Sequence, residues 1–120
     1  EVNSQKMHAK EPEERCLMIN NGGVHIKVMI EDIVYAEIFN RKIVIHKMDE
    51  TIEYYGKMSD LEALAGENFF RPHRAYLINF KYVEKYDAST VYLEKGSVLM
   101  AKGKFPEFVK RYMKYIRRKG

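Results

Sequence analysis

The centre of the chain reads Asn68-Phe69-Phe70-Arg71-Pro72-His73-Arg74-Ala75-Tyr76-Leu77-Ile78-Asn79. Its aromatic residues and its short apolar run can anchor the segment to a hydrophobic core. Three basic side chains, those of Arg71, His73 and Arg74, then lie on a braced edge rather than on a loose loop. Guanidinium groups held in this way suit phosphate oxygens and the edge of guanine. The stretch therefore makes nucleic acid the first partner to consider.

The length and composition of the chain fit one domain. Its 120 residues are 46% hydrophobic and 32% charged, which is typical of a globular protein with a core of its own. The single cysteine, Cys16, excludes an internal disulfide and favours a reducing cytosol. No apolar run approaches the roughly 20 residues of a membrane span, and residues 1–14 are too polar for a secretory signal. We therefore expect a cytoplasmic protein that does not associate with a membrane.

The first 14 residues differ in character from the rest. They contain few apolar side chains and include Pro12, so we expect a flexible tail or the remnant of an interdomain linker. The chain begins with Glu rather than Met, which predicts that it is part of a longer protein. We expect the folded domain to cover residues 15–118.

The net charge of +4 is unevenly distributed. Residues 1–66 carry 8 Lys and Arg against 12 Asp and Glu, a net charge of −4, whereas residues 67–120 carry 13 against 5, a net charge of +8. This asymmetry predicts a basic surface built by the second half and favours an anionic partner. The alternative is a solvated helix end, because Arg117-Arg118-Lys119 alone supplies three positive charges.

Most of the chain shows the pattern of short β-strands. β-branched and aromatic residues recur in short runs separated by Asn, Asp and Gly, which is typical of antiparallel hairpins. We expect a hairpin over 16–28, a three-stranded meander over 33–55, and further strands at 82–86, 91–93 and 98–100. The predicted fold class is therefore mainly β.

Two helices are also expected. Ser59-Asp60-Leu61-Glu62 has the spacing of a capping box and predicts the start of a short helix that Gly66 ends. Asn79 is expected to cap a turn or a short helix through its side chain. A C-terminal helix is predicted because Lys and Arg fill its last turn and its apolar residues recur at helical spacing. These apolar residues are Phe105, Phe108, Val109, Tyr112 and Ile116.

No group of residues predicts catalysis. None of the four histidines has a metal-ligand spacing with a Cys or a carboxylate, and Asn21-Gly22-Gly23 lacks the Lys and the Ser or Thr of a phosphate-binding loop. Cys16 lies in an apolar run, which is typical of an inert core thiol. Asp49 and Glu50 are adjacent, but neighbours on a strand point to opposite faces. We therefore predict no enzyme activity, no metal and no cofactor.

Basic residues in three separate loops form a more coherent set. Arg41-Lys42 lies at a hairpin bend, His73 and Arg74 lie in the central stretch, and Lys102-Gly103-Lys104 precedes the last helix. Loops of this kind can converge on one edge of a sheet, and the N–H groups at the start of a helix attract phosphate. No helix-turn-helix pattern is present. We therefore expect nucleic acid to be bound by loops.

The same residues also have ordinary structural interpretations. Arg71 would form a salt bridge with Glu67 or Glu84, His73 would be a hydrogen-bonded core histidine, and Arg41-Lys42 would be a charged hairpin tip. The nine tyrosines fit strand packing better than base stacking. Taken singly, none of these residues identifies a function.

Taken together, they resemble a known family. Phe70-Arg71-Pro72-His73-Arg74-Ala75-Tyr76-Leu77-Ile78-Asn79 is similar to the hallmark of the LytTR (LytR/AlgR-type) DNA-binding domain, roughly F-x-R-x-H-R/N-S-[YF]-aliphatic-aliphatic-N. Asp32-Ile33-Val34-Tyr35-Ala36-Glu37 resembles the family's D-I-[LVI]-[YF]-[FIA]-E stretch, and residues 56–62 resemble its loop into the short helix. Val91-Tyr92-Leu93 and the loop 99–105 occupy the expected places. The likeness runs from Arg15 to Ile116.

The resemblance implies an elongated fold of short antiparallel strands, with one short helix and a C-terminal helix, whose loops enter successive major grooves of duplex DNA. It implies the output domain of a bacterial two-component response regulator, behind a receiver domain that this chain lacks, and two copies on repeated sites. Arg41 and Arg74, with His73, are then expected to reach base edges or nearby phosphates. Lys42, Lys102 and Lys104 are expected to neutralise phosphates.

Two positions depart from the family pattern. The family's S-R-R/N stretch before the last helix is Lys102-Gly103-Lys104 here, and Lys lacks the bidentate fork that reads guanine. Ala75 replaces the usual Ser and removes a hydroxyl that could contact phosphate. We therefore expect specificity to depend on Arg74 and Arg41.

The sequence is also compatible with two other functions. A tyrosine-rich sheet with a basic rim would suit single-stranded RNA or DNA, and it would need exposed aromatic residues on one sheet face. A protein-interaction domain would use its sheet edges, and its charge would serve only solubility. Competition between duplex and single strands separates the first of these from duplex binding.

Overall fold

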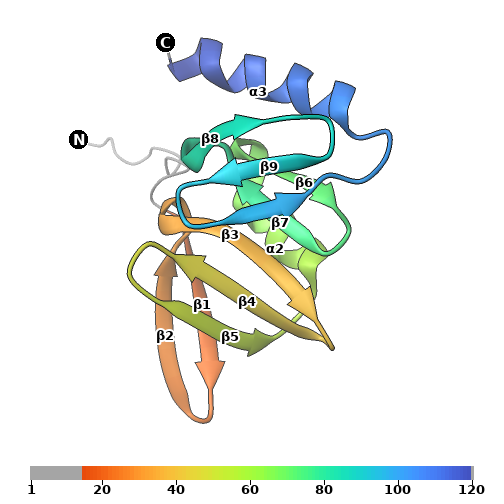
Figure 1. Cartoon of the computed structure of the whole chain (residues 1–120). Coiled ribbons are helices and arrows are strands. Elements are labelled where there is room, and N and C mark those ends of the chain that lie inside the picture. The colour runs from red at the N-terminus through yellow and green to blue at the C-terminus, as the bar shows by residue number, and fades with distance from the viewer. Residues whose placement is uncertain (1–14, 120) are drawn as a thin grey trace, which may run out of the picture.

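A computed structural model describes residues 15–119 of the chain (Figure 1). The expected tail over residues 1–14 lies outside this range. The described domain is flat, with principal extents of 48, 39 and 24 Å. Its elements are β1 (Cys16–Asn21), β2 (Val24–Met29), η2 (Ile30–Asp32), β3 (Ile33–Phe39), β4 (Lys42–Lys47), β5 (Thr51–Tyr55), α2 (Met58–Ala65), η3 (Gly66–Asn68), β6 (Phe69–His73), β7 (Tyr76–Asn79), η4 (Phe80–Tyr82), β8 (Val83–Tyr86), β9 (Thr90–Leu93), β10 (Ser97–Leu99) and α3 (Phe105–Lys119).

The centre of the fold is an antiparallel five-stranded sheet in the order β5-β4-β3-β7-β6. The expected meander over residues 33–55 forms β3, β4 and β5, and the central basic stretch forms the β6–β7 hairpin. Strands β1 and β2 form a separate hairpin, and β8, β9 and β10 form a three-stranded sheet. The mainly β prediction is confirmed.

One hydrophobic core lies between the five-stranded sheet, the β1–β2 hairpin and α2. Alternate residues of β3 and β4 face it, since side chains on a strand alternate between its two faces. Its most completely buried members come from several elements and include Ile19, Val28, Ala36, Ile43, Ile45, Leu61 and Leu77.

A second core joins the same sheet to the β8–β9–β10 sheet and to α3. Its centre is aromatic: Phe108 lies edge-on to Phe70, with ring centroids 5.5 Å apart, and Phe80 lies 5.9 Å from Phe108. Helix α3 contributes Phe108 and Tyr115 to this core, whereas Ile116 is 44% exposed. The predicted apolar stripe is therefore correct in its first turns and wrong at Ile116.

The start of α2 also differs from the prediction. The helix begins at Met58 with Lys57 as its N-cap, and no side chain of the described part of the chain caps it. The N–H groups of Asp60 and Leu61 donate to the carbonyl of Lys57 instead. Ser59 therefore lies inside the first turn, and the predicted capping box does not form, whereas Gly66 ends the helix with a φ of 81° as expected.

Asn79 anchors the end of the central hairpin. Its side chain is 2% exposed; Nδ2 donates to the carbonyl of Ile33 at 2.9 Å, and Oδ1 accepts from the N–H of Lys81 at 3.0 Å. The second bond caps η4, as the sequence predicts. The first ties β7 to the start of β3. The final residue of the basic stretch is thus structural.

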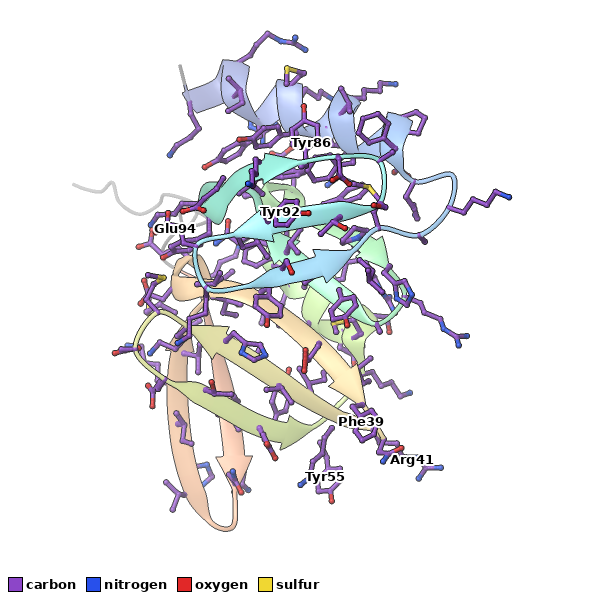
Figure 2. The ribbon with its side chains drawn as sticks, in the orientation of Figure 1. Phe39, Arg41, Tyr55, Tyr86, Tyr92 and Glu94 are labelled. Atoms are coloured by element: carbon purple, nitrogen blue, oxygen red, sulfur yellow. The ribbon has the colours of Figure 1, made fainter. Side chains whose placement is uncertain are left out.

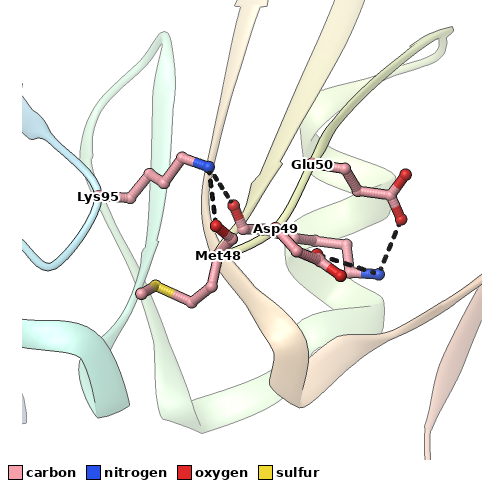
Figure 3. Close-up of polar contacts among 5 residues, drawn as sticks. Met48, Asp49, Glu50 and Lys95 are labelled. Atoms are coloured by element: carbon pink, nitrogen blue, oxygen red, sulfur yellow. Dashed lines mark hydrogen bonds and ion pairs between the residues drawn. The ribbon is translucent and has the colours of Figure 1, made fainter.

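Lys95 connects two turns on the side of the domain opposite the β3–β4 turn (Figures 1 and 3). Its Nζ donates to the carbonyls of Lys47 at 2.8 Å and Met48 at 3.1 Å. The side chain of Lys47 in turn donates to Glu50 at 3.1 Å. One ammonium group therefore holds the β9–β10 turn against the β4–β5 turn.

Replacing Lys95 with Met should lower the free energy of unfolding by about 0.5–1.5 kcal/mol, because the apolar stem is kept and the two hydrogen bonds are lost. The free energy is measured by urea denaturation. Lys114→Met is the control, since Lys114 is exposed on α3. An equal loss in both variants would show that Lys95 does not join the two sheets.

His46 is half-buried against Tyr35, with the two rings stacked at 4.2 Å and 14°. Within residues 15–119 its Nε2 has no hydrogen-bond partner, and Glu37 Oε1 at 3.8 Å is too distant to serve as one. Burial lowers the pKa of His46 below its usual value, and the negative charge of Glu37 offsets only part of that effect. Protonation of His46 is therefore unfavourable in the folded domain.

The free energy of unfolding should fall as the pH drops below about 6.5, the pKa of His46 in the unfolded chain. Between that value and the lower folded pKa, the unfolded chain binds more protons than the folded domain. His46→Phe keeps the stacked ring and should lose less stability between pH 7.5 and pH 5 than the wild type. Urea denaturation at both pH values measures this, with the exposed His25 changed to Gln as the control. If His46→Phe and the wild type lost equal stability, His46 would not be responsible.

Candidate nucleic-acid interface

The β3–β4 turn presents Arg41 in a tight loop of two residues. Phe39 and Lys42 form the last strand pair, and between them Asn40 and Arg41 have φ values of 52° and 67°. Two successive positive φ values are typical of a type I′ turn, whose twist matches that of the strands. The side chain of Arg41 is exposed at the tip. Lys42 is less available, because its Nζ lies 3.4 Å from Glu53 Oε1.

The β6–β7 turn places Arg74 at its tip and uses Arg71 as a brace. His73 and Tyr76 form the last strand pair, and Arg74 is exposed between them. The guanidinium of Arg71 donates to the carbonyl of Arg74 through Nη2 at 2.8 Å and Nε at 3.3 Å. Its Nη1 reaches Glu62 Oε1 at 3.3 Å. The predicted partners of Arg71 were therefore wrong, because α2 packs beside β6 and brings Glu62 within reach.

His73 is fixed by the same turn. Its Nδ1 accepts a hydrogen bond from the N–H of Ala75 at 3.1 Å, and its ring lies 5.5 Å from that of Tyr76. An accepting Nδ1 carries no proton, so the proton of the imidazole is assigned to Nε2. The side chain is half-buried, so it is not the core histidine of the alternative interpretation.

The loop before α3 carries the third basic group. The N–H of Lys104 donates to the carbonyl of Ala101 at 3.1 Å, and Gly103 has a φ of 87°, a value that glycine adopts readily at this point of a turn. Lys102 is exposed at the corner. Lys104 is half-buried, with its Nζ 3.6 Å from Glu107 and 5.9 Å from the ring centre of Phe70.

Backbone hydrogen bonds connect these three turns, with the β6–β7 turn in the middle. The N–H of Ile38 donates to the carbonyl of Ala75 at 2.9 Å, and the N–H of Ala101 donates to the carbonyl of Pro72 at 2.7 Å. Figure 1 shows the three turns along one side of the domain. Arg41 and Arg71 also line one open cleft of about 750 Å³ between the β3–β4 turn and the start of α2.

The ion pairs divide the predicted basic residues into two groups. Within residues 15–119, Arg41, Arg74 and Lys102 have no carboxylate partner, whereas Lys42 and Lys104 each have one. The first three therefore carry the unneutralised charge of this edge.

Sequence reasoning missed how α3 is attached behind the interface. Arg111 Nη2 donates to the carbonyl of Phe69 at 3.0 Å, and its guanidinium lies 5.3 Å from the ring centre of Phe70. Arg118 reaches Asn68 Oδ1 at 2.9 Å. Part of the positive charge of the last helix thus holds β6 in place. The sequence did indicate this attachment, since Arg111 falls on the same helical face as Phe108 and Tyr115.

Among the described residues, no three His, Cys, Asp or Glu side chains are placed to hold a metal ion. Within the same range, no helix combines the length and the apolar character that crossing a bilayer requires.

Two known regulatory proteins are similar in sequence to this chain. The chain is 28% identical over 95 residues to the accessory gene regulator protein A of Staphylococcus epidermidis, covering 76% of this chain and 40% of that protein. It is 29% identical over 77 residues to the transcriptional regulatory protein NatR of Bacillus subtilis, covering 63% of this chain and 33% of that protein. The chain thus spans less than half the length of these relatives.

A solved structure shares the fold. It is the LytTr DNA-binding domain of a protein from Bacillus cereus described as a methyl-accepting/DNA response regulator. The TM-score is 0.69 at 16% identity, and the match covers 81% of this chain and 95% of that one. The family model described as the LytTr DNA-binding domain matches residues 24–120. The chain therefore belongs to the LytTr DNA-binding domain family.

Proposed function

We propose that this domain binds duplex DNA sequence-specifically through its three basic turns, as the output domain of a transcription regulator in the bacterial cytoplasm. The observation that carries the proposal is the pair of backbone hydrogen bonds that join the β3–β4 turn and the loop before α3 to the β6–β7 turn. These bonds give three exposed cationic tips a common, rigid support. Binding needs neither catalysis nor a cofactor.

The dimensions of the domain support contact with more than one groove. Successive major-groove sites on one face of DNA lie about 34 Å apart, and the longest extent of the domain is 48 Å. A major groove about 12 Å wide admits a two-stranded β-ribbon. The apolar side of α3 is occupied by the second core, so the turns rather than a recognition helix would enter the grooves.

The roles of the basic residues follow from their contacts. Among the described side chains, no carboxylate pairs with Arg41 or Arg74, and their guanidinium forks suit the O6 and N7 atoms of guanine. His73 would donate from Nε2 to a phosphate or base acceptor. Lys102 would neutralise a phosphate, and Lys42 and Lys104 would contribute less because each already has a carboxylate partner.

The single-stranded alternative is less well supported. A stacking platform needs several exposed rings on one sheet face, whereas most aromatic residues here pack in the second core. Phe39 and Tyr55 are the large aromatic side chains that remain exposed within residues 15–119. Selection of bound sequences from a random duplex pool, followed by competition with the separated strands, tests the proposal. Equal competition by duplex and single strands would contradict it.

Lys102→Gln should remove about one phosphate contact, which lowers the slope of log Kd against log salt by about one. It should weaken binding to all duplexes about equally. Lys104→Gln should reduce it less, because Glu107 already offsets the charge of Lys104. Titrations of a selected duplex between about 50 and 200 mM salt measure both slopes. A larger change for Lys104→Gln than for Lys102→Gln would overturn these assignments.

We also propose that an upstream receiver domain and a second copy on a repeated site complete the regulator. The names and the greater lengths of the two relatives support a larger regulator. Binding of the domain to duplexes with one and with two selected sites, followed by mass photometry, would show whether two copies assemble.

A further inference from the structure

Two large aromatic side chains are exposed beside Arg41. Phe39 is 71% exposed and Tyr55 is 73% exposed. Strand register places Phe39 opposite Lys42, and Lys42 opposite Tyr55, so the three side chains form a row across one face at the end of the sheet. Figure 2 shows Phe39, Arg41 and Tyr55 gathered at this end. An apolar surface therefore adjoins the cationic tip of the β3–β4 turn.

The two rings border a shallow groove rather than standing as isolated exposed residues. This groove of about 340 Å³ is lined by the three residues of the row, by Asn40, and by Val44 and Glu53, the next residues on the same face of β4 and β5. The ammonium of Lys42 lies 5.6 Å from the ring centre of Tyr55, which holds that ring against the end of the sheet. Single exposed apolar side chains are common on protein surfaces, whereas an ordered pair of aromatic rings beside an exposed arginine indicates a binding surface.

The charges on this face restrict what the row can contact. Glu37 and Glu53 lie opposite Val44 in the register, one row further into the sheet. Their carboxylates would repel phosphates that approached the middle of the face. An anionic duplex can therefore meet only the last row, where Arg41 projects beyond the strands.

We propose that Phe39 contacts the 5-methyl group of a thymine, in a base pair next to the one that Arg41 reads. The inference rests on the proposed binding of duplex DNA by the β3–β4 turn. Phe39 is two residues from Arg41, on the last pair of a two-residue turn, so a major groove about 12 Å wide that admits the turn can hold both side chains. The thymine methyl is the apolar group that base pairs present in the major groove. Tyr55 lies on the same face at the other end of the row, with Lys42 between the two rings.

The test uses a duplex selected from a random pool by the wild-type chain, with each thymine replaced in turn by deoxyuridine. Deoxyuridine keeps the Watson–Crick pair and removes only the methyl group. One substitution should weaken wild-type binding about fourfold, which corresponds to about 0.8 kcal/mol for one buried methyl-sized group. Phe39→Ala should bind the unmodified duplex about as weakly and should be insensitive to that substitution. Phe39→Leu should remain sensitive.

Two controls distinguish the loss of a methyl contact from a general loss of exposed apolar surface and from a loss of stability. Val24→Ala removes another exposed apolar side chain, 61% exposed, from the start of β2 in the distant β1–β2 hairpin and should keep full sensitivity to the methyl group. Urea denaturation of Phe39→Ala should match the wild type, because Phe39 contributes little to the core.

Two results would overturn the inference. One is that every deoxyuridine duplex binds as tightly as the unmodified duplex, while Arg74→Ala still weakens binding; this leaves the proposed function intact. The other is that Phe39→Ala abolishes self-association of the free chain in sedimentation, which would assign the row to a second copy. If the wild type showed no preference for duplex DNA at all, the proposed function itself would fail.

Discussion

Replacing Arg74 with Ala is expected to weaken binding of a selected duplex by about 1–3 kcal/mol, or roughly 5- to 150-fold, and to relax the preference at one base pair. Arg74 is exposed at the tip of the β6–β7 turn, and Arg71 holds the carbonyl of that same residue with two hydrogen bonds. Because the turn is held by Arg71 and not by the Arg74 side chain, the loss should appear in binding and not in stability. Anisotropy titrations at fixed salt measure it.

Arg117→Ala is the matched control, since it removes the same charge from the exposed end of α3. Arg74→Lys adds a finer comparison: it keeps the charge and removes the planar fork, so it should keep the salt dependence and lose the base preference. Equal effects of Arg74→Ala and Arg117→Ala would mean that Arg74 contributes only to the general positive field.

Replacing Arg41 with Gly is expected to change stability and binding in opposite directions. Arg41 has a φ of 67°, a left-handed conformation that costs an L-residue about 1–2 kcal/mol and costs glycine little. The change would also give the turn an Asn-Gly dipeptide, the preferred pair for type I′. Greater freedom of glycine in the unfolded chain offsets part of this gain, so we expect a net increase of about 0.5–1 kcal/mol in the free energy of unfolding.

The same change should weaken duplex binding by about 1–3 kcal/mol, because the guanidinium is lost. Urea denaturation and anisotropy titration of one preparation measure the two effects. Arg41→Lys is the control: it keeps the unfavourable φ and the charge, so it should not gain stability. A variant Arg41→Gly that bound as tightly as the wild type would remove Arg41 from the interface. The chain would then retain an unfavourable turn residue for another reason.

Local patterns predicted most of the fold. The hairpin over 16–28 and the meander over 33–55 were correct because alternating apolar residues and turn-forming Asn, Asp and Gly act over a few neighbouring positions. The boundaries of the helices were less accurate. The first turn of α2 closes on the carbonyl of Lys57, and Tyr115 replaces Ile116 in the core because positions seven and eight after Phe108 both fall near the same helical face.

The candidate interface was predictable only in part. The sequence placed basic residues in three loops, but ion pairing depends on strand register and helix packing. Glu53 reaches Lys42 because β5 lies beside β4, and Glu62 reaches Arg71 because α2 lies beside β6. The sequence alone does not show which carboxylate lies beside which basic side chain. A count of charges therefore cannot separate the basic residues that form ion pairs from those that do not.

The hydrogen bond inside the β6–β7 turn also limits what His73 can recognise. With Nδ1 occupied by the N–H of Ala75, the imidazole can offer only a proton and can receive none. It can therefore donate to a phosphate oxygen or to a major-groove acceptor (N7 of a purine, O6 of guanine or O4 of thymine), but it cannot accept from the exocyclic amino group of cytosine or adenine. One main-chain hydrogen bond thus removes the ability of this histidine to accept a hydrogen bond from DNA and leaves only its ability to donate one.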